Sequence, residues 1–340
     1  MRAAVLVRHG DARTAFELRE VPDPVPAPHE VLIRVEAFGL NFADVMARLG
    51  LYRDAPPLPA VLGYDVAGTV AQAGSEAQGL FQPGDRVAAL TRFGGYAEYA
   101  AADARAVVKI PPELDAGAAT ALMTQYGTAY FMTDQITRLF PGDQVLIHAA
   151  AGGVGTALVQ LALHRGCTVY GTAGSEEKLA YLRQQGVQHP INYRSRDFVE
   201  AVQAIGGSRP LDAVFDPVGG PSVKRGMQLL RPGGRMLVYG ASSLTDARGL
   251  FQKLRVALGF GFYSPIGLVG QSKSIIGVNM LRIADHRPAY LQETLRGVVR
   301  LAGEGVLRPV TGGVYPAEQI GEAHAALGGR QTTGKLVMRW

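Results

Sequence analysis

The amino-acid sequence predicts an α/β protein with two domains, one rich in short β-strands and one formed around a doubly wound parallel sheet. At 340 residues the chain has the length of two ordinary domains. Up to about Thr120 it is rich in Pro, Gly and short alternating apolar runs, separated by turn sequences such as Gln82–Asp85. From about Gln144, apolar strands alternate with helical segments, which is typical of a parallel α/β sheet.

The β-rich domain is expected to come from two pieces of the chain. Mixed strands and helices return after about Ser264, so the parallel-sheet domain is predicted to be inserted into a first domain that the C-terminal part completes. The predicted segments are residues 1–122, 123–264 and 265–340. The strands expected in the β-rich domain include Met1–Val7, Val31–Val35, Val66–Val70, Arg86–Leu90 and Lys335–Met338.

The parallel sheet is predicted from short apolar runs that helices separate. The expected strands are Gln144–His148, Thr168–Thr172, Pro190–Asn192, Ala213–Asp216 and Arg235–Tyr239. The helices between them are expected to start near Val154, Ser175, Ser195 and Pro221.

The turn after the first of these strands is the most specific motif of the chain. It reads Ala149-Ala150-Ala151-Gly152-Gly153-Val154-Gly155 and opens an amphipathic helix. Strand, small-residue turn and helix form the context that a dinucleotide-binding fingerprint requires, although its first glycine is replaced by Ala150. We expect the residues from Ala151 to Gly155 to contact the cofactor phosphates, because a helix N-terminus offers free N–H groups and the positive end of a dipole.

The residues after the second strand favour NADP over NAD. NAD-binding chains carry a carboxylate there that accepts from the ribose 2′-hydroxyl, whereas this chain continues Ala173-Gly174-Ser175. An acid at that place would repel a 2′-phosphate. Ser175, Lys178 and Tyr193 are the expected contacts of that phosphate.

Composition limits the classes of partner. The formal net charge of +5 is spread along the chain without a run of Lys or Arg, so nucleic-acid binding is not indicated. The single cysteine, Cys167, excludes an intramolecular disulfide and favours the cytoplasm. The least charged stretch, Val256–Gln271, is shorter than the roughly 20 apolar residues of a spanning helix. Contact with a membrane is therefore not favoured.

The sequence does not offer a zinc site. A catalytic zinc needs Cys and His ligands, and no two histidines lie three or four residues apart. The histidines are His9, His29, His148, His164, His189, His286 and His324. We therefore expect no bound metal.

Several segments resemble the zinc-free medium-chain dehydrogenase/reductases, specifically their quinone oxidoreductase (zeta-crystallin-like) group. Gly39–Tyr52 resembles the N-x-x-D-x-x-x-R-x-G-x-Y segment of that group, and Pro83–Val87, the Ala-rich turn and Asp216–Gly220 continue the resemblance over nearly the whole chain. His189–Tyr193 and other stretches are most similar to its synaptic-vesicle membrane protein type branch. The resemblance implies a GroES-like catalytic domain, a Rossmann cofactor domain and a homodimer joined at Ser274–Val278.

The resemblance also implies roles for single residues. Asn41 and Tyr64 stand where zinc-dependent relatives carry a Cys and a His ligand, whereas Met46 stands where better-known quinone reductases carry a tyrosine. The residues implied on the nicotinamide side are Thr128, Tyr239, Gly240 and Asn279, and Lys335 is implied near the phosphates.

These observations predict an NADPH-dependent reductase that transfers hydride to a quinone or an α,β-unsaturated carbonyl. Asn41 and Tyr52 are expected to donate hydrogen bonds to the carbonyl oxygen, Asp44 to support them, and Tyr52 or solvent to supply the proton. Tyr64 is a candidate site residue or a packing residue. Two alternatives stay open: an enoyl-thioester reductase, with Arg53 or Arg92 near a carrier phosphate, and an NADPH-binding protein without turnover.

The segment Leu244–Gly270 has two further interpretations. Its basic residues Arg248, Lys253 and Arg255 precede aromatic residues and several glycines. It is expected to be a lid over the substrate or an ordinary loop and helix packed on the cofactor domain.

Overall fold

The computed structural model describes residues 1–247 and 249–340, so Arg248 lies outside the described residues. The chain divides into two compact units. Unit 1 joins Met1–Thr128 to Met280–Trp340, and unit 2 is Ala129–Asn279. The first limit lies a few residues after the expected end at residue 122. The second lies beyond the expected end at residue 264, because the last strand of the parallel sheet ends only at Gly277.

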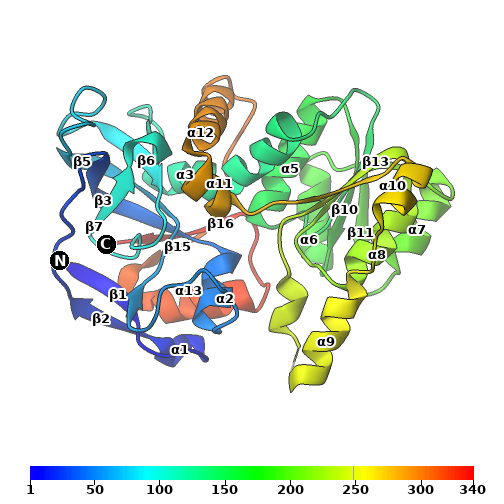
Figure 1. Cartoon of the computed structure of the whole chain (residues 1–340), viewed down its shortest axis with the longest axis horizontal. Helices are drawn as coiled ribbons and strands as arrows, with labels where there is room; N and C mark the ends of the chain where they lie inside the picture. Colours follow the sequence, from blue (N-terminus) through cyan, green and yellow to red (C-terminus); the bar gives the residue numbers. More distant parts are fainter. Residues whose placement is uncertain (248) are drawn as a thin grey trace. The chain divides into compact units, whose positions relative to one another are not determined.

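Unit 1 is built on strands that pair antiparallel except for β15 with β16, and most of them are labelled in Figure 1. Its larger sheet has the order β15-β16-β3-β5-β6-β8, with β7 paired to β3, and a small sheet has the order β2-β1-β4. The strands before unit 2 are β1 (Arg2–Leu6), β2 (Phe16–Glu20), β3 (Glu30–Leu40), β4 (Ala60–Val61), β5 (Asp65–Ala73), β6 (Arg86–Leu90), β7 (Tyr99–Asp103) and β8 (Val107–Lys109). Those after it are β15 (Thr311–Pro316) and β16 (Lys335–Arg339), so the C-terminal part completes the larger sheet as expected.

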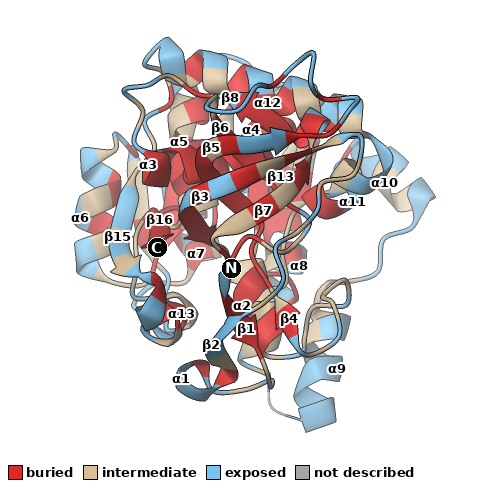
Figure 2. Ribbon diagram, turned by 90° about the vertical axis from the view of Figure 1, so that its left-hand side faces the viewer, coloured by how far each residue is buried: buried red, intermediate tan, exposed pale blue. Residues whose placement is uncertain are grey.

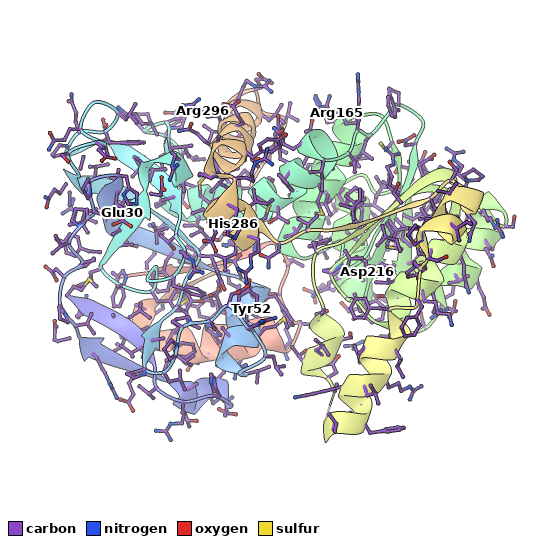
Figure 3. All side chains as sticks on the ribbon, viewed as in Figure 1. Glu30, Tyr52, Arg165, Asp216, His286 and Arg296 are labelled. Carbon is purple, nitrogen blue, oxygen red and sulfur yellow. The ribbon has the colours of Figure 1, made fainter. Side chains whose placement is uncertain are left out.

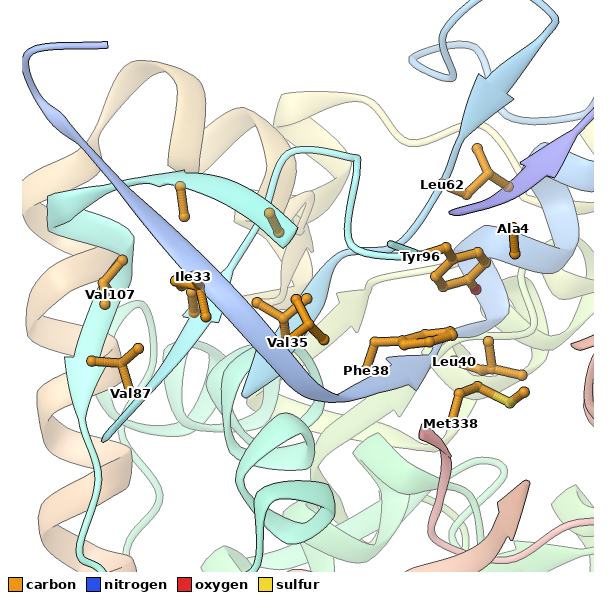
Figure 4. Packing of buried hydrophobic residues seen from close by; sticks show 14 of the residues in the cluster. Ala4, Ile33, Val35, Phe38, Leu40, Leu62, Val87, Tyr96, Val107 and Met338 are labelled. Atoms are coloured by element: carbon orange, nitrogen blue, oxygen red, sulfur yellow. The ribbon is translucent and has the colours of Figure 1, made fainter. Parts of the chain in front are cut away.

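The helices of unit 1 are short apart from one. They are α1 (Ala12–Ala15), α2 (Phe42–Arg48), α3 (Ala116–Ala121), η1 (Ala104–Ala106), α11 (Met280–His286), α12 (Pro288–Gly303), η5 (Ala317–Gln319) and α13 (Ile320–Gly328). The core between the strands is apolar and aromatic, and Figure 4 shows Phe38 beside Tyr96 in it. The ring centroids of Phe38 and Tyr96 lie 5.0 Å apart. Because Phe38 is on β3 and Met338 on the paired β16, this core depends on both pieces of the chain.

A continuous helical stretch leads from unit 1 into unit 2. It consists of α3, η2 (Leu122–Tyr126), α4 (Gly127–Tyr130) and η3 (Phe131–Gln135), where η2 and η3 are π-helical turns. Such turns are rare and occur frequently at functional sites.

Unit 2 is a six-stranded parallel sheet with the order β11-β10-β9-β12-β13-β14. Its strands are β9 (Gln144–Ile147), β10 (Thr168–Ala173), β11 (His189–Asn192), β12 (Leu211–Asp216), β13 (Leu230–Val238) and β14 (Ser274–Gly277). If the six strands are numbered 1 to 6 along the chain, from β9 to β14, their order in the sheet is 3-2-1-4-5-6. This is the arrangement of a doubly wound dinucleotide-binding sheet, and the strand order reverses between β9 and β12. The predicted fold class is thus confirmed in this unit.

The helices of unit 2 connect these strands. They are α5 (Gly153–His164), α6 (Glu176–Gln184), α7 (Phe198–Gly206), α8 (Pro221–Leu229), η4 (Ser242–Thr245), α9 (Gly249–Gly259) and α10 (Pro265–Gln271). Figure 2 shows α9 and α10 as largely exposed, and neither contains a buried residue. Leu250 and Phe251 of α9 are 84% and 79% exposed. Among the described residues, no helix has the length and apolar character needed to cross a membrane.

Candidate active site

Asn41 lies where the longest strand of unit 1 turns into a helix. β3 ends at Leu40 and α2 begins at Phe42, so Asn41 is the residue at the helix start. Its backbone N–H donates to Oδ2 of Asp44 over 2.9 Å. An acid in the first turn that accepts from this N–H stabilises the helix start. The predicted supporting residue Asp44 therefore fixes the backbone at Asn41.

The side chain of Asn41 belongs to a buried polar cluster with Asp65 and Lys335. Its Nδ2 donates to Oδ2 of Asp65 over 2.8 Å, and its Oδ1 accepts from the Lys335 ammonium over 2.9 Å. The same ammonium lies 2.7 Å from Oδ2 of Asp65, in an ion pair whose two side chains are 0% exposed. Since an ammonium can only donate and a carboxylate can only accept, the cluster fixes which end of the amide is oxygen and which is nitrogen.

Lys335 is therefore placed in a different setting from the one that the resemblance implies. We expected its ammonium near cofactor phosphates, whereas it lies fully buried in unit 1, between Asn41 and Asp65. Burial lowers the pKa of Lys335, and the charge of Asp65 opposes that shift.

Gly39 makes room for this ion pair. A Cβ at Gly39 would stand 2.1 Å from Oδ1 of Asp65 and 2.1 Å from Cε of Lys335. Both distances are far below van der Waals contact, so any side chain here would displace the pair. The glycine of the Gly39–Tyr52 motif is thus explained by the cluster two residues away.

Asp44 is a fully buried acid beside this cluster. Burial raises the pKa of Asp44 to about 7, the hydrogen bond from Asn41 lowers it, and the negative charge of Asp65 raises it further. The Asp44 carboxyl therefore changes its protonation state around neutral pH.

On another side of the same core, the Tyr96 hydroxyl pairs with Nε2 of His324 at 3.2 Å.

Tyr52 and Tyr64 lie against one another next to this cluster. Their ring centroids are 6.2 Å apart in an edge-to-face arrangement, and Tyr64 also packs on Phe93 at 5.2 Å. Figure 3 labels Tyr52, which is half-buried and follows α2. Burial raises the pKa of the Tyr52 phenol above its ordinary value of 10.0. The phenol therefore stays protonated at neutral pH, as a hydrogen-bond donor must. The neighbouring Tyr64 hydroxyl opposes this shift, since its interaction with the Tyr52 phenol lowers the pKa of Tyr52.

The glycine turn of unit 2 forms as the motif predicts. Gly152 is the residue before α5, and no side chain caps this helix start. A Cβ at Gly155 would lie 2.3 Å from the carbonyl oxygen of Ala149, so only glycine lets α5 pack this closely on the turn. Ala149 itself has a positive φ of 52°, which is uncommon for a residue other than glycine.

Ser175, Lys178 and Tyr193 meet after β10 and β11. Oγ of Ser175 accepts from the backbone N–H of Lys178 over 3.3 Å and caps α6. A Cβ at Gly174 would lie 2.6 Å from the Tyr193 hydroxyl and 3.3 Å from Nε of Arg194. Burial lowers the pKa of Lys178, the negative charge of Glu177 raises it, and the positive charge of Arg194 lowers it. The Tyr193 phenol and Arg194 therefore lie beside Gly174, and Ser175 and Lys178 follow it at the start of α6, with the acid Glu177 next to Lys178.

The remaining predicted cofactor residues also follow strands. Tyr239 and Gly240 come directly after β13, and Asn279 comes after β14. Asp216, labelled in Figure 3, ends β12 and accepts from the backbone of Val218 and Gly219 at 2.6 and 2.9 Å, an architectural role. The predicted cofactor residues of unit 2 thus lie at the carboxyl edge of the parallel sheet, where ligands of such sheets bind.

Thr128 belongs to unit 1, near its boundary with unit 2. Its hydroxyl donates to the carbonyl of Thr124 over 2.6 Å within the helical stretch. This bond orients the hydroxyl along the helix axis.

No group of three or more His, Cys, Asp or Glu side chains is placed to hold a metal ion in residues 1–247 and 249–340. Cys167 is buried, and burial raises the pKa of its thiol to about 12. A thiol with so high a pKa does not present the thiolate that metals bind.

Two residues of these groups were missed by the sequence reasoning. Asp65 completes the cluster around Asn41, and Arg194 joins the residues around Gly174. A signal for Arg194 exists, because it directly follows Tyr193 and adds positive charge where a phosphate was expected. Asp65 directly follows Tyr64, but its partner Lys335 is 270 residues away in the sequence.

Comparison with known proteins is consistent with this architecture. The family model of the alcohol dehydrogenase GroES-like domain matches residues 27–112, and the zinc-binding dehydrogenase model matches residues 153–295. The chain is 33% identical to the mouse protein "synaptic vesicle membrane protein VAT-1 homolog", over 99% of this chain and 83% of that protein.

Two further relatives carry names of reductases. Human quinone oxidoreductase is 32% identical over 99% of this chain and 97% of its own length. A 2-haloacrylate reductase from a Burkholderia species is 33% identical over 99% of this chain and 98% of its own length.

A solved structure extends the similarity to three dimensions. Quinone oxidoreductase from Escherichia coli, in complex with NADPH, matches with a TM-score of 0.84 and 27% identity over 100% of both chains. The resemblance of the motifs and the predicted two-domain fold are confirmed. The chain belongs to the medium-chain dehydrogenase/reductase family, in its quinone oxidoreductase group.

Proposed function

We propose that the protein is an NADPH-dependent, zinc-independent reductase that transfers hydride to a quinone or an α,β-unsaturated carbonyl. The observation that carries this proposal is the fixed orientation of the Asn41 amide. The Lys335 ammonium donates to the amide oxygen, and Asp65 accepts from one of the two amide N–H groups. The second N–H is left to donate to an acceptor oxygen.

The residues of unit 2 fit NADPH. The uncapped start of α5 offers backbone N–H groups to the pyrophosphate, and Ser175, Tyr193, Lys178 and Arg194 would hold the 2′-phosphate. Tyr239, Gly240 and Asn279 would line the nicotinamide half further along the same edge. When bound, NADPH supplies the hydride.

The protein's part in the chemistry is electrostatic. As hydride arrives at the β-carbon of an enone, negative charge develops on the carbonyl oxygen, and a proton must then reach the α-carbon. Donors held in place before the reaction stabilise such charge without a cost of reorganisation. Asn41 and the neutral phenol of Tyr52 are these donors. Because burial raises its pKa, the Tyr52 phenol is a weak acid, so solvent is the proposed source of the proton that reaches the α-carbon.

The test is NADPH oxidation, followed by the loss of its absorbance, with 9,10-phenanthrenequinone, 1,4-benzoquinone and crotonyl-CoA offered separately, and with NADH in parallel. Turnover of a quinone with NADPH well above NADH supports the proposal. Asn41→Ala is expected to lower kcat about 100-fold or more, the usual effect of removing one oxyanion donor. Arg296→Gln, on the exposed surface of α12, is the matched control and should leave kcat unchanged.

The same panel decides between the alternatives. Turnover of crotonyl-CoA alone would move the assignment to enoyl-thioester reduction. The guanidinium of Arg92 is already bonded to Asp285 at 2.9 Å, which leaves exposed Arg53 as the better candidate for a carrier phosphate. Tight NADPH binding without turnover of any acceptor would support a binding protein and withdraw the roles of Asn41 and Tyr52.

We further propose a cytoplasmic homodimer joined at β14. Within the described residues this strand pairs with β13 on one side and has no strand on its other side. An edge strand offers unpaired backbone groups to a second copy. Sedimentation equilibrium at micromolar concentration should give twice the monomer mass of 36.1 kDa. A monomer would contradict the pairing.

A further inference from the structure

A cavity of about 350 Å³ opens on unit 2, away from the dinucleotide turn. Its basic lining residues are Arg209, Lys224 and Lys273, and none of its lining residues is acidic. Arg209 lies just before β12 and Lys273 just before β14, so the cavity is at the amino ends of these strands. In a parallel sheet the amino ends lie at the edge opposite the carboxyl ends, where the glycine turn is.

Lys273 makes this cavity more than a basic surface patch. It is only 8% exposed, and its ammonium donates to the carbonyl of Met227 over 2.8 Å. Among the described residues no carboxylate pairs with it. Burial lowers the pKa of Lys273, and the like charge of Arg209 lowers it further. A buried ammonium is costly unless it has an anionic partner.

Lys335, which is also deeply buried, has the carboxylate partner that Lys273 lacks among the described residues. Lys335 has the carboxylate of Asp65 at 2.7 Å and the amide oxygen of Asn41 at 2.9 Å. Lys273 instead faces a cavity whose other charged groups, Arg209 and Lys224, are also cations without a carboxylate partner among the described residues. The charged side chains that line the cavity are therefore all positive.

We propose that this cavity binds a small organic anion, with a phosphate group at the three cations and an aromatic or apolar body against Phe262 and Tyr263. A phosphate satisfies several donors at once through strong, charge-assisted hydrogen bonds. The volume is within the range of small-molecule sites, and the lining also contains Met227 and Leu268, so there is room for more than an inorganic ion. This second site is separate from the carboxyl edge that would hold NADPH.

Phenyl phosphate is the probe, because it combines a phosphate with an aromatic ring. The full chain is titrated with it by calorimetry in excess NADPH, which occupies the other phosphate-binding region. We expect saturable one-site binding, tighter than that of inorganic phosphate. Lys273→Met keeps the apolar stem and removes the charge, and Lys224→Met removes an exposed cation with no risk to the core. Each should weaken binding at least tenfold, or about 1.4 kcal/mol.

The matched control is Lys253→Met on α9, an exposed lysine of the same unit that does not line the cavity. It should leave the affinity unchanged. Equal loss with Lys253→Met would show attraction by net charge alone and overturn the proposal, as would the absence of phenyl phosphate binding at millimolar concentration. If the probe fails to bind and Lys273→Met dissociates a dimer, an acidic group of a second copy occupies the cavity instead.

Discussion

The two candidate regions of this protein are held in opposite ways. Around Asn41, side chains from the start of α2, from β5 and from β16 hold one another by charge and hydrogen bonds inside unit 1. At the start of α5, the backbone itself forms the site, and Gly155 contributes by having no side chain. The first region should therefore respond most to a change of charge, and the second to a change of volume.

Lys335→Met tests the first half of this comparison and has the largest expected effect. It leaves the carboxylate of Asp65 buried without its counter-ion, which typically costs about 3–5 kcal/mol of the free energy of unfolding. Urea denaturation measures the loss. The double variant Asp65→Leu with Lys335→Met removes both charges and should be less destabilised than the single variant. If the two substitutions merely add, the pair is not coupled.

Asp44→Asn tests the role of charge in the Asn41 region through the pH dependence of stability. The unfolded acid titrates near 3.8 and the folded one near 7, so the folded protein holds a proton that the unfolded chain has lost between these values. Stability therefore falls as pH rises through this window and levels off above about 7. The asparagine variant lacks this fall.

The difference in the free energy of unfolding, Asp44→Asn minus the original protein, should increase by about 3 kcal/mol from pH 5 to pH 8, at 1.36 kcal/mol for each pKa unit. Urea titrations of both proteins at each pH give the difference, in which all other titrating groups cancel. A difference that is constant across this range would contradict the raised pKa.

Gly155→Ala tests the second half of the comparison. Its Cβ would stand 2.3 Å from the Ala149 carbonyl oxygen, so the turn and α5 must separate. We expect the Kd for NADPH, measured by fluorescence titration, to rise about 100-fold, or roughly 2.7 kcal/mol. Gly303→Ala is the control, because a Cβ there meets nothing within 4 Å. Unchanged NADPH affinity in Gly155→Ala would show that the turn does not bind the phosphates.

Arg194→Met has the smallest expected effect and separates the two cofactors. The guanidinium lies near the Tyr193 hydroxyl and Lys178, so its loss should raise the KM for NADPH about tenfold, or ~1.4 kcal/mol, and leave the KM for NADH unchanged. Steady-state kinetics with both cofactors measures this. An equal rise for NADH would place Arg194 outside the 2′-phosphate contacts.

The contrast between the regions also explains what the sequence could predict. The turn at Ala149–Gly155, the strands of unit 2 and the helix start near Ser175 are encoded by neighbouring residues, so local patterns were sufficient. The cluster around Asn41 joins residues 294 and 270 positions apart, and no local pattern reports such a contact. For this reason the partner of Lys335 was not predicted, whereas Asn41 and Asp44, which are bonded to one another, lie in one motif.

The order of the two units along the chain has a consequence for synthesis. β16, which carries Lys335, is translated only after all of unit 2, whereas its partner strand β3 and Asp65 are translated before it. On the ribosome, unit 2 can fold while unit 1 still lacks a strand of its main sheet and the counter-ion of a buried acid. A nascent chain can thus complete its dinucleotide-binding sheet before the Asn41 side chain has the Lys335 partner that fixes its orientation.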